Sequence, residues 1–166
     1  MLNAEEMRFA CDDARRRHAA LGNLILAGDR TAMGFLQFFS TLATALLSAG
    51  VAVKFASSPS LPPQLGWVMI SAAAPLIVAA TLAFAALWSS DFRCEGEEPE
   101  FWLWALDAPE ETLAIQRMFL KRLQESININ RRVNRRVNRL MSAARACAAS
   151  SPALALILTV IALTAH

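Results

Sequence analysis

Charged residues are missing from three long apolar stretches of the chain. No Asp, Glu, Lys or Arg occurs from Thr31 to Val53, from Phe55 to Ser90, or from Ala146 to His166. A helix needs about 20 apolar residues to cross the hydrocarbon core of a bilayer. We therefore predict an all-α integral membrane protein with three transmembrane helices, at about 31–53, 66–88 and 146–166. The last stretch is the shortest in strongly apolar residues, and without it the chain is a two-span hairpin with a cytosolic tail.

Residues 1–30 have the pattern of an amphipathic helix. Apolar positions recur at steps of three and four: Met7, Ala10, Cys11, Ala14, His18, Leu21 and Ile25. His18 lies on this apolar face, and the sequence shows no partner for it, so we interpret it as a partly buried structural histidine. The polar start also differs from a cleaved signal peptide, so we expect 31–53 to be an uncleaved anchor.

The first two predicted spans form a transmembrane hairpin over residues 31–90. The connection from Lys54 to Gln64 is rich in Ser and Pro, as turns are. Trp67 and Trp88 are 21 residues apart, which is about 31 Å along a helix. Tryptophan prefers the two interfaces of a bilayer, so we expect these residues to mark them. Pro75 lies inside the second span and can kink it.

Residues 91–145 combine a connector with a long basic helix. The connector holds four acidic residues between Glu95 and Glu100, and then the apolar residues Phe101, Trp102, Trp104 and Leu106. These apolar residues either lie among lipid headgroups or pack against the cytosolic helices. From Asp107 to about Ser150, heptad-spaced apolar residues predict one helix that runs into the third span, 146–166.

The distribution of Lys and Arg orients the predicted spans. Five of the 16 basic residues precede the first span, one lies in the first loop, and ten lie in the second loop. Basic residues are enriched in cytoplasmic loops. We therefore expect the amino terminus and the long helix in the cytoplasm, and the carboxyl terminus on the opposite side of the membrane.

The first span carries one polar stripe. Its members step by 4, 3 and 4 residues, so they share a helix face: Gln37, Thr41, Thr44 and Ser48. Two interpretations remain open. The stripe either hydrogen-bonds a neighbouring helix or lines a water path between subunits of an oligomer.

A four-residue repeat, NRRVNRRVNRL, occupies Asn130–Leu140. Because a helix has 3.6 residues per turn, each copy is rotated by about 40° from the one before. Three interpretations apply to its arginines: an anchor near anionic lipids, a phosphate site for a nucleotide ligand, or a surface for acidic protein, including the Glu95–Glu100 segment. The arginines are Arg131, Arg132, Arg135, Arg136 and Arg139. The asparagines of the repeat can set the register between copies of this helix.

The sequence carries no enzymatic signature. It has no HExxH, GxSxG or glycine-rich phosphate loop, and its cysteines and histidines form no ligand cluster. We therefore expect no catalytic residue, no metal and no cofactor. The net charge of +2 is small and says nothing about nucleic acid, and we expect no nucleic-acid partner. The spans hold no ionisable residue beyond the cysteine and histidine at the edges of the last, which argues against an active transporter.

The order of these elements resembles a known group of membrane proteins. An amphipathic helix leads into the segment 26–36, LAGDRTAMGFL, followed by a Pro/Ser turn, a second span, a long basic helix and a last apolar segment. This resembles the membrane effectors of Pycsar antiphage systems and the related SLATT effectors found beside nucleotide second-messenger synthases. The first span of Pycsar effectors opens with an Ala-Asp-x-Lys-Ala-like motif. Asp29 and Ala32 match it, whereas Gly28 and Thr31 replace its alanine and lysine.

The resemblance implies a function for the chain. It implies a bacterial inner-membrane effector that senses a cyclic nucleotide from a partner cyclase, forms a homo-oligomer and impairs the membrane, with its carboxyl terminus in the periplasm. Asp29 and Arg30, in the matched motif, are the implied ligand contacts beside the arginine repeat. Two other functions fit the pattern: an accessory subunit that docks a cytosolic partner through the long helix, and a passive oligomeric channel.

Overall fold

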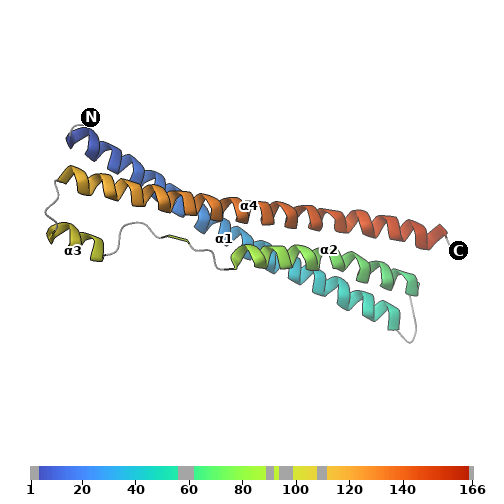
Figure 1. Cartoon of the computed structure of the whole chain (residues 1–166). Helices are drawn as coiled ribbons and strands as arrows, with labels where there is room; N and C mark the ends of the chain where they lie inside the picture. The colour runs from blue at the N-terminus through green and yellow to red at the C-terminus, as the bar shows by residue number, and fades with distance from the viewer. Residues whose placement is uncertain (1–3, 56–61, 89–91, 94–98, 108–111, 165–166) are drawn as a thin grey trace. The chain divides into compact units, whose positions relative to one another are not determined.

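A computed structural model describes most of the chain, and this part is almost entirely helical. That part comprises residues 4–55, 62–88, 92–93, 99–107 and 112–164. It contains four helices (Figure 1): α1 (Ala4–Phe55), α2 (Pro63–Leu87), α3 (Pro99–Asp107) and α4 (Thr112–Thr164). Three of them, α1, α2 and α4, are long and apolar enough to cross a membrane. The prediction of an all-α chain with three such helices is therefore confirmed for the described residues.

Helix α1 joins the amphipathic segment and the first apolar stretch without a break. It runs for 52 residues, with Glu5 and Glu6 in its first turn and Lys54 in its last. Acidic residues stabilise the positive amino end of a helix, and basic residues the negative carboxyl end. No proline occurs between these ends. The change from polar to apolar composition near residue 30 therefore marks a change of surroundings and leaves the backbone helical.

Helix α4 is also continuous, from Thr112 to Thr164, and it contains Pro152. It begins later than the predicted Asp107, because Asp107 ends α3. A proline inside a helix removes the hydrogen bond to the carbonyl four residues earlier, here that of Ala148. Residues 108–111, at the start of the predicted long helix, lie outside the described part. So do residues 56–61 of the predicted connection between the first two spans, and Glu95, Glu97 and Glu98 of the acidic connector.

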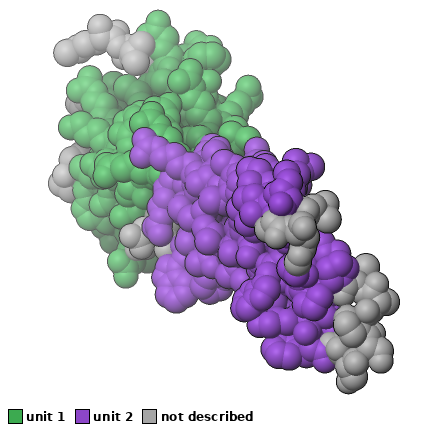
Figure 2. Space-filling model, turned by 90° about the vertical axis from the view of Figure 1, so that its right-hand side faces the viewer, with its two compact units in different colours: residues 1–28, 89–135 green, residues 29–88, 136–166 purple. Residues whose placement is uncertain are grey.

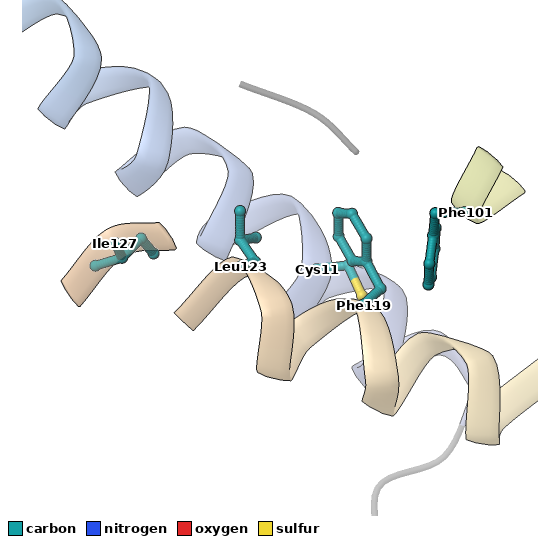
Figure 3. Packing of buried hydrophobic residues seen from close by; sticks show 5 residues of the cluster. All are labelled: Cys11, Phe101, Phe119, Leu123 and Ile127. Carbon is teal, nitrogen blue, oxygen red and sulfur yellow. The ribbon is translucent and has the colours of Figure 1, made fainter. Parts of the chain in front are cut away.

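The structure divides into two compact units (Figure 2). Unit 1 comprises residues 1–28 and 89–135, and unit 2 comprises residues 29–88 and 136–166. The core of unit 1 brings together α1, α3 and the first part of α4 (Figure 3): Cys11, Phe101, Phe119, Leu123 and Ile127. Phe101 is thus buried against the helices, whereas Leu103 and Trp104 on the same helix are exposed. The side chains of Trp102 and Leu106 lie outside the described part.

The core of unit 2 is built from small and aromatic residues of three helices: Phe39, Ala43, Leu76, Ala79 and Ala144. The buried alanines of α2, including Ala79, allow close packing of the helices. Ser151 of α4 adds a polar contact, because its buried hydroxyl donates a 2.7 Å hydrogen bond to the carbonyl oxygen of Ala72. Hydrogen bonds of this kind contribute about 0.6–2 kcal/mol to helix association in a membrane.

Helices α1 and α2 approach most closely at two glycines. A Cβ atom added to Gly50 would lie 2.8 Å from the carbonyl oxygen of Gly66, and one added to Gly66 would lie 2.7 Å from that of Gly50. Real side chains do not tolerate such distances, so the backbones touch here because neither residue has a side chain. No single GxxxG segment predicts this contact, since each helix contributes one glycine.

Proline and tryptophan define the remaining features of α2. Pro63 begins the helix, at a position that needs no backbone N–H donor. Pro75 lies inside it, and the helix nevertheless continues to Leu87. Trp67 and Trp88 are both largely exposed. The Lys54 Nζ lies 3.5 Å from the centroid of the Trp67 ring, a cation–π contact between the end of α1 and the start of α2.

Candidate ligand site

Unit 1 contains a buried polar cluster centred on Asn130. The Asn130 side chain accepts a 3.1 Å hydrogen bond from the Arg93 backbone N–H and donates a 3.0 Å bond to the Arg93 carbonyl. Its amide nitrogen also lies 3.1 Å from His18 Nε2. Asn130 is fully buried and His18 is 2% exposed. The predicted structural histidine is thus confirmed as a buried residue.

The hydrogen bonds of Asn130 determine whether His18 Nε2 donates or accepts. The Arg93 N–H identifies which end of the Asn130 amide is the oxygen, so the amide nitrogen must donate toward His18. His18 Nε2 is therefore the acceptor of this hydrogen bond. This arrangement ties α1, α4 and residue 93 together through hydrogen bonds at a site with no charged side chain among its partners.

The three asparagines of the repeat lie in different surroundings. Asn130 is buried, Asn134 is half-buried and Asn138 is exposed. Asn130 uses its polar atoms within its own chain, so it is not available to set the register between copies. That interpretation remains a prediction for Asn134 and Asn138.

The predicted ligand-binding residues of α4 are all exposed. They divide between the units: Arg131, Arg132 and Arg135 belong to unit 1, and Arg136 and Arg139 to unit 2. Arg15 pairs with Asp12 and Arg17 pairs with Asp13, and among the described residues no ion pair of these five arginines is found. Asp29 is half-buried and Arg30 is exposed on α1. The structure thus places these five arginines on the surface of the chain.

The four polar-stripe residues are exposed as well. The Thr41 hydroxyl donates a 2.9 Å hydrogen bond to the Gln37 carbonyl of its own helix, a common way for threonine to satisfy its hydroxyl. Thr44 lines a groove of about 350 Å³ between α1 and α2, together with Ser40 and Thr81. Gln37, Thr44 and Ser48 form no hydrogen bond with another helix among the described residues. Both interpretations of the stripe, helix packing and a water path, therefore concern contacts with another chain.

A cavity in unit 1 provides a second group of ligand-competent residues. It has a volume of about 420 Å³ and lies between the first parts of α1 and α4. We call it the arginine cavity; its lining residues are Arg8, Cys11, Asp12, Arg15, Thr112, Ile115, Gln116 and Phe119. Pockets of 300–1,000 Å³ suit small ligands. The sequence signal for it was the spacing of Arg8, Cys11 and Arg15 on one helix face, but the α4 residues opposite could not be assigned to them.

The polar groups of the arginine cavity have defined surroundings. Arg15 Nη1 lies 3.6 Å from a carboxylate oxygen of Asp12, and the Arg15 guanidinium carbon lies 5.0 Å from the centroid of the Phe119 ring. Burial raises the pKa of the Cys11 thiol above its ordinary value, an effect that nearby Arg15 partly offsets and Asp12 reinforces. At neutral pH the thiol is therefore protonated and a poor nucleophile.

Metal-ligand geometry and comparisons with known proteins both bear on the site. Within the described residues, no group of three or more His, Cys, Asp or Glu side chains could hold a metal ion. No family model matches the chain, and neither a curated protein nor a solved structure matches it. The arguments about function therefore depend on the geometry and on the sequence pattern.

Proposed function

We propose that the protein spans a bacterial inner membrane through α1, α2 and the second part of α4. The supporting observation is that each of these helices exposes large apolar side chains in unit 2. Phe38, Phe84 and Ile157 are 60%, 48% and 55% exposed, respectively. Such surfaces are unfavourable in water and suit a bilayer. The remaining segments carry an excess of basic residues, which supports a cytoplasmic location for unit 1.

In this membrane the protein acts as an effector of an antiphage system. A cyclic nucleotide produced by a partner cyclase activates it, and the active homo-oligomer impairs the membrane. The exposed stripe of Gln37, Thr41, Thr44 and Ser48 supports this function. Polar side chains on an otherwise apolar surface are unfavourable in lipid, so a second copy of the chain or a water path is the favourable neighbour for them.

A membrane-potential assay tests this proposal. The chain is expressed with a cyclase in bacterial cells that carry a potential-sensitive dye, and depolarisation is expected when the cyclase is active. Replacing the stripe by apolar residues of similar size (Gln37→Leu, Thr41→Val, Thr44→Val, Ser48→Ala) should abolish it. Thr164→Val is the matched control, because the Thr164 hydroxyl is also exposed and also bonds its own helix, away from the stripe. Cells that keep their potential with every cyclic nucleotide present would contradict the proposal.

A second candidate function is supported by the arginine repeat. Five exposed guanidiniums on one helix suit an acidic cytosolic partner, so the protein would serve as an accessory subunit that docks this partner through α4. The same cells distinguish the two functions. An accessory subunit leaves the potential unchanged, and replacing all five arginines by Gln releases the partner in a pull-down. Depolarisation without any cyclase would instead identify a passive channel.

A further inference from the structure

The arginine cavity has the charge of an anion site. Arg8 and Arg15 are seven residues apart on α1, so they lie on the same helix face about 10 Å apart along the axis. Asp12 is the acidic residue among the lining side chains, which leaves the cavity with a net positive charge. Guanidinium groups bind phosphate with two parallel hydrogen bonds and remain charged at any physiological pH.

Gln116 adds a requirement for a hydrogen-bond donor. Its side-chain oxygen is buried and has no hydrogen-bond partner among the described residues. A buried acceptor without a donor costs about 1–3 kcal/mol. The oxygen does not touch the open space of the cavity in this structure, but Gln116 lines that space. A rotation of the Gln116 side chain would let an N–H or O–H group of a ligand reach the oxygen and remove the cost.

The rest of the lining describes the body of the ligand. Ile115, Phe119 and Cys11 form an apolar wall, and Phe119 and Cys11 belong to the core of unit 1 (Figure 3). The cavity also includes Thr112, the first residue of α4. Helix amino ends carry partial positive charge and favour phosphate groups. An apolar ring with a donor on its edge and a phosphate at one end matches all three parts.

We propose that the arginine cavity binds a mononucleotide, with its phosphate on Arg8 and Arg15 and a ring N–H or amino group on the Gln116 side-chain oxygen. This inference rests on the proposed function, because the nucleotide would be the activating ligand. It assigns the ligand site to the cavity rather than to the exposed repeat Arg131–Arg139. The repeat offers guanidiniums, but the cavity adds an apolar wall and an unsatisfied acceptor.

The same chemistry, a phosphate beside an N–H donor, occurs in phosphatidylethanolamine headgroups. The binding experiment therefore uses the full-length chain in detergent micelles and four kinds of soluble probe. They are individual nucleoside 5′-monophosphates with their 3′,5′-cyclic forms, the corresponding nucleosides, inorganic phosphate, and phosphoethanolamine. Calorimetry is expected to show binding of at least one nucleotide, and binding of the other three kinds weaker by about tenfold or more, since each lacks one of the three contacts.

Variants of the cavity test the assignment of each contact. Arg8→Gln and Arg15→Gln together should weaken nucleotide binding by about 10–100-fold, because two charge-assisted contacts are lost. Gln116→Met keeps the size of the side chain and removes the unsatisfied oxygen, so it should fold normally and bind about tenfold more weakly. Asp12→Asn removes the negative charge and should strengthen binding. The matched control is Arg131→Gln with Arg132→Gln, which lie outside the cavity and should leave the affinity unchanged.

Several results would overturn this inference. They are the absence of binding by every nucleotide tested, unchanged affinity in the Arg8/Arg15 and Gln116 variants, loss of binding in the Arg131/Arg132 control, or tighter binding of phosphoethanolamine than of any nucleotide. Unfolding of the Arg15 variant would not confuse the result, since Arg8→Gln alone leaves the contact between Arg15 and Phe119 intact. Nucleotide binding without depolarisation in cells would refute the proposed function and leave the site standing.

Discussion

Asn130 satisfies three polar groups through one side-chain amide. Its oxygen accepts from the Arg93 N–H, and its nitrogen donates to the Arg93 carbonyl and to His18 Nε2. Aspartate has no donor for the carbonyl or the imidazole, and leucine has neither a donor nor an acceptor. The residue is also fully buried, so water cannot take over these roles.

Replacing Asn130 by leucine should therefore lower the stability of unit 1. The change leaves the Arg93 N–H and carbonyl and the His18 ring without their partner, at a cost of about 3 kcal/mol in the free energy of unfolding. Urea denaturation of the full chain in detergent, followed by circular dichroism, measures the loss. Asn138→Leu on the exposed side of α4 is the control and should change stability by less than about 0.5 kcal/mol. Equal effects of the two substitutions would contradict the role assigned to Asn130.

Cys11 should react slowly with alkylating reagents in the folded chain. Its thiol is buried, and its raised pKa keeps it protonated at neutral pH, whereas the thiolate is the reactive form. A variant with Cys94→Ser and Cys147→Ser keeps Cys11 as its single thiol, and mass spectrometry follows its reaction with iodoacetamide. The rate should rise when the pH is raised through the elevated pKa, and it should rise again on unfolding. Equal rates in the folded and unfolded chain would contradict this description.

The sequence predicted which residues share a helix face better than it predicted which residues contact one another. The apolar face of residues 1–30 correctly placed His18 and Cys11 in the interior. The partner of His18 is 112 residues away, and no spacing rule connects positions so distant. The asparagine repeat was treated as one stripe, but the rotation of about 40° per copy moves Asn130 into the core and Asn138 out of it.

At the scale of elements, the contact of Gly50 with Gly66 determines how closely α1 and α2 pack. The two helices touch through backbone atoms at this point. Any side chain here would push them apart and loosen the neighbouring contacts, which in unit 2 involve mostly alanine and phenylalanine. Small residues at helix crossings have this role in membrane proteins generally.

Alanine substitutions should separate this contact from a general effect of glycine. Gly50→Ala and Gly66→Ala should each destabilise the hairpin by about 1–3 kcal/mol, because the new methyl group overlaps a backbone carbonyl. Gly34→Ala is the matched control on α1, since a Cβ atom there meets nothing within 4 Å. It should be neutral or stabilise the helix by up to about 1 kcal/mol. Denaturation in mixed micelles measures all three, and a stabilising effect of Gly50→Ala would contradict the close contact.

The sequence predicted the three apolar helices and the continuation of the long basic helix into the third of them, but it did not predict the continuity of α1. Hydrophobic patterning reports the surroundings of a segment, so the change near residue 30 was assigned to a boundary between a helix and a span. The backbone requires a breaker to end a helix, and α1 has no internal proline. In α4 the internal Pro152 did not end the helix either, because proline is tolerated where packing compensates for the lost hydrogen bond.

At the scale of the whole molecule, the basic residues predict a single orientation in the membrane. Fifteen of the 16 lie in segments assigned to the cytoplasm, and Lys54 alone lies in the first loop. Green fluorescent protein fused before Met1 should be fluorescent, and alkaline phosphatase fused after His166 should be active. Alkaline phosphatase folds only outside the cytoplasm, so exchanging the two reporters should silence both. If alkaline phosphatase fused after His166 is inactive and green fluorescent protein fused there is fluorescent, the chain is a two-span hairpin.

Unit 1 is assembled from two distant parts of the chain, residues 1–28 and 89–135, and this sets an order of events during synthesis. His18 leaves the ribosome 112 residues before Asn130, a delay of about 6–22 s at typical rates of translation. The hairpin of α1 and α2 needs no residue from this later segment to bring Gly50 against Gly66. During the delay the residues of α4 that cover the apolar face around Cys11 have not yet been made, so this face of the newborn chain stays exposed until α4 emerges.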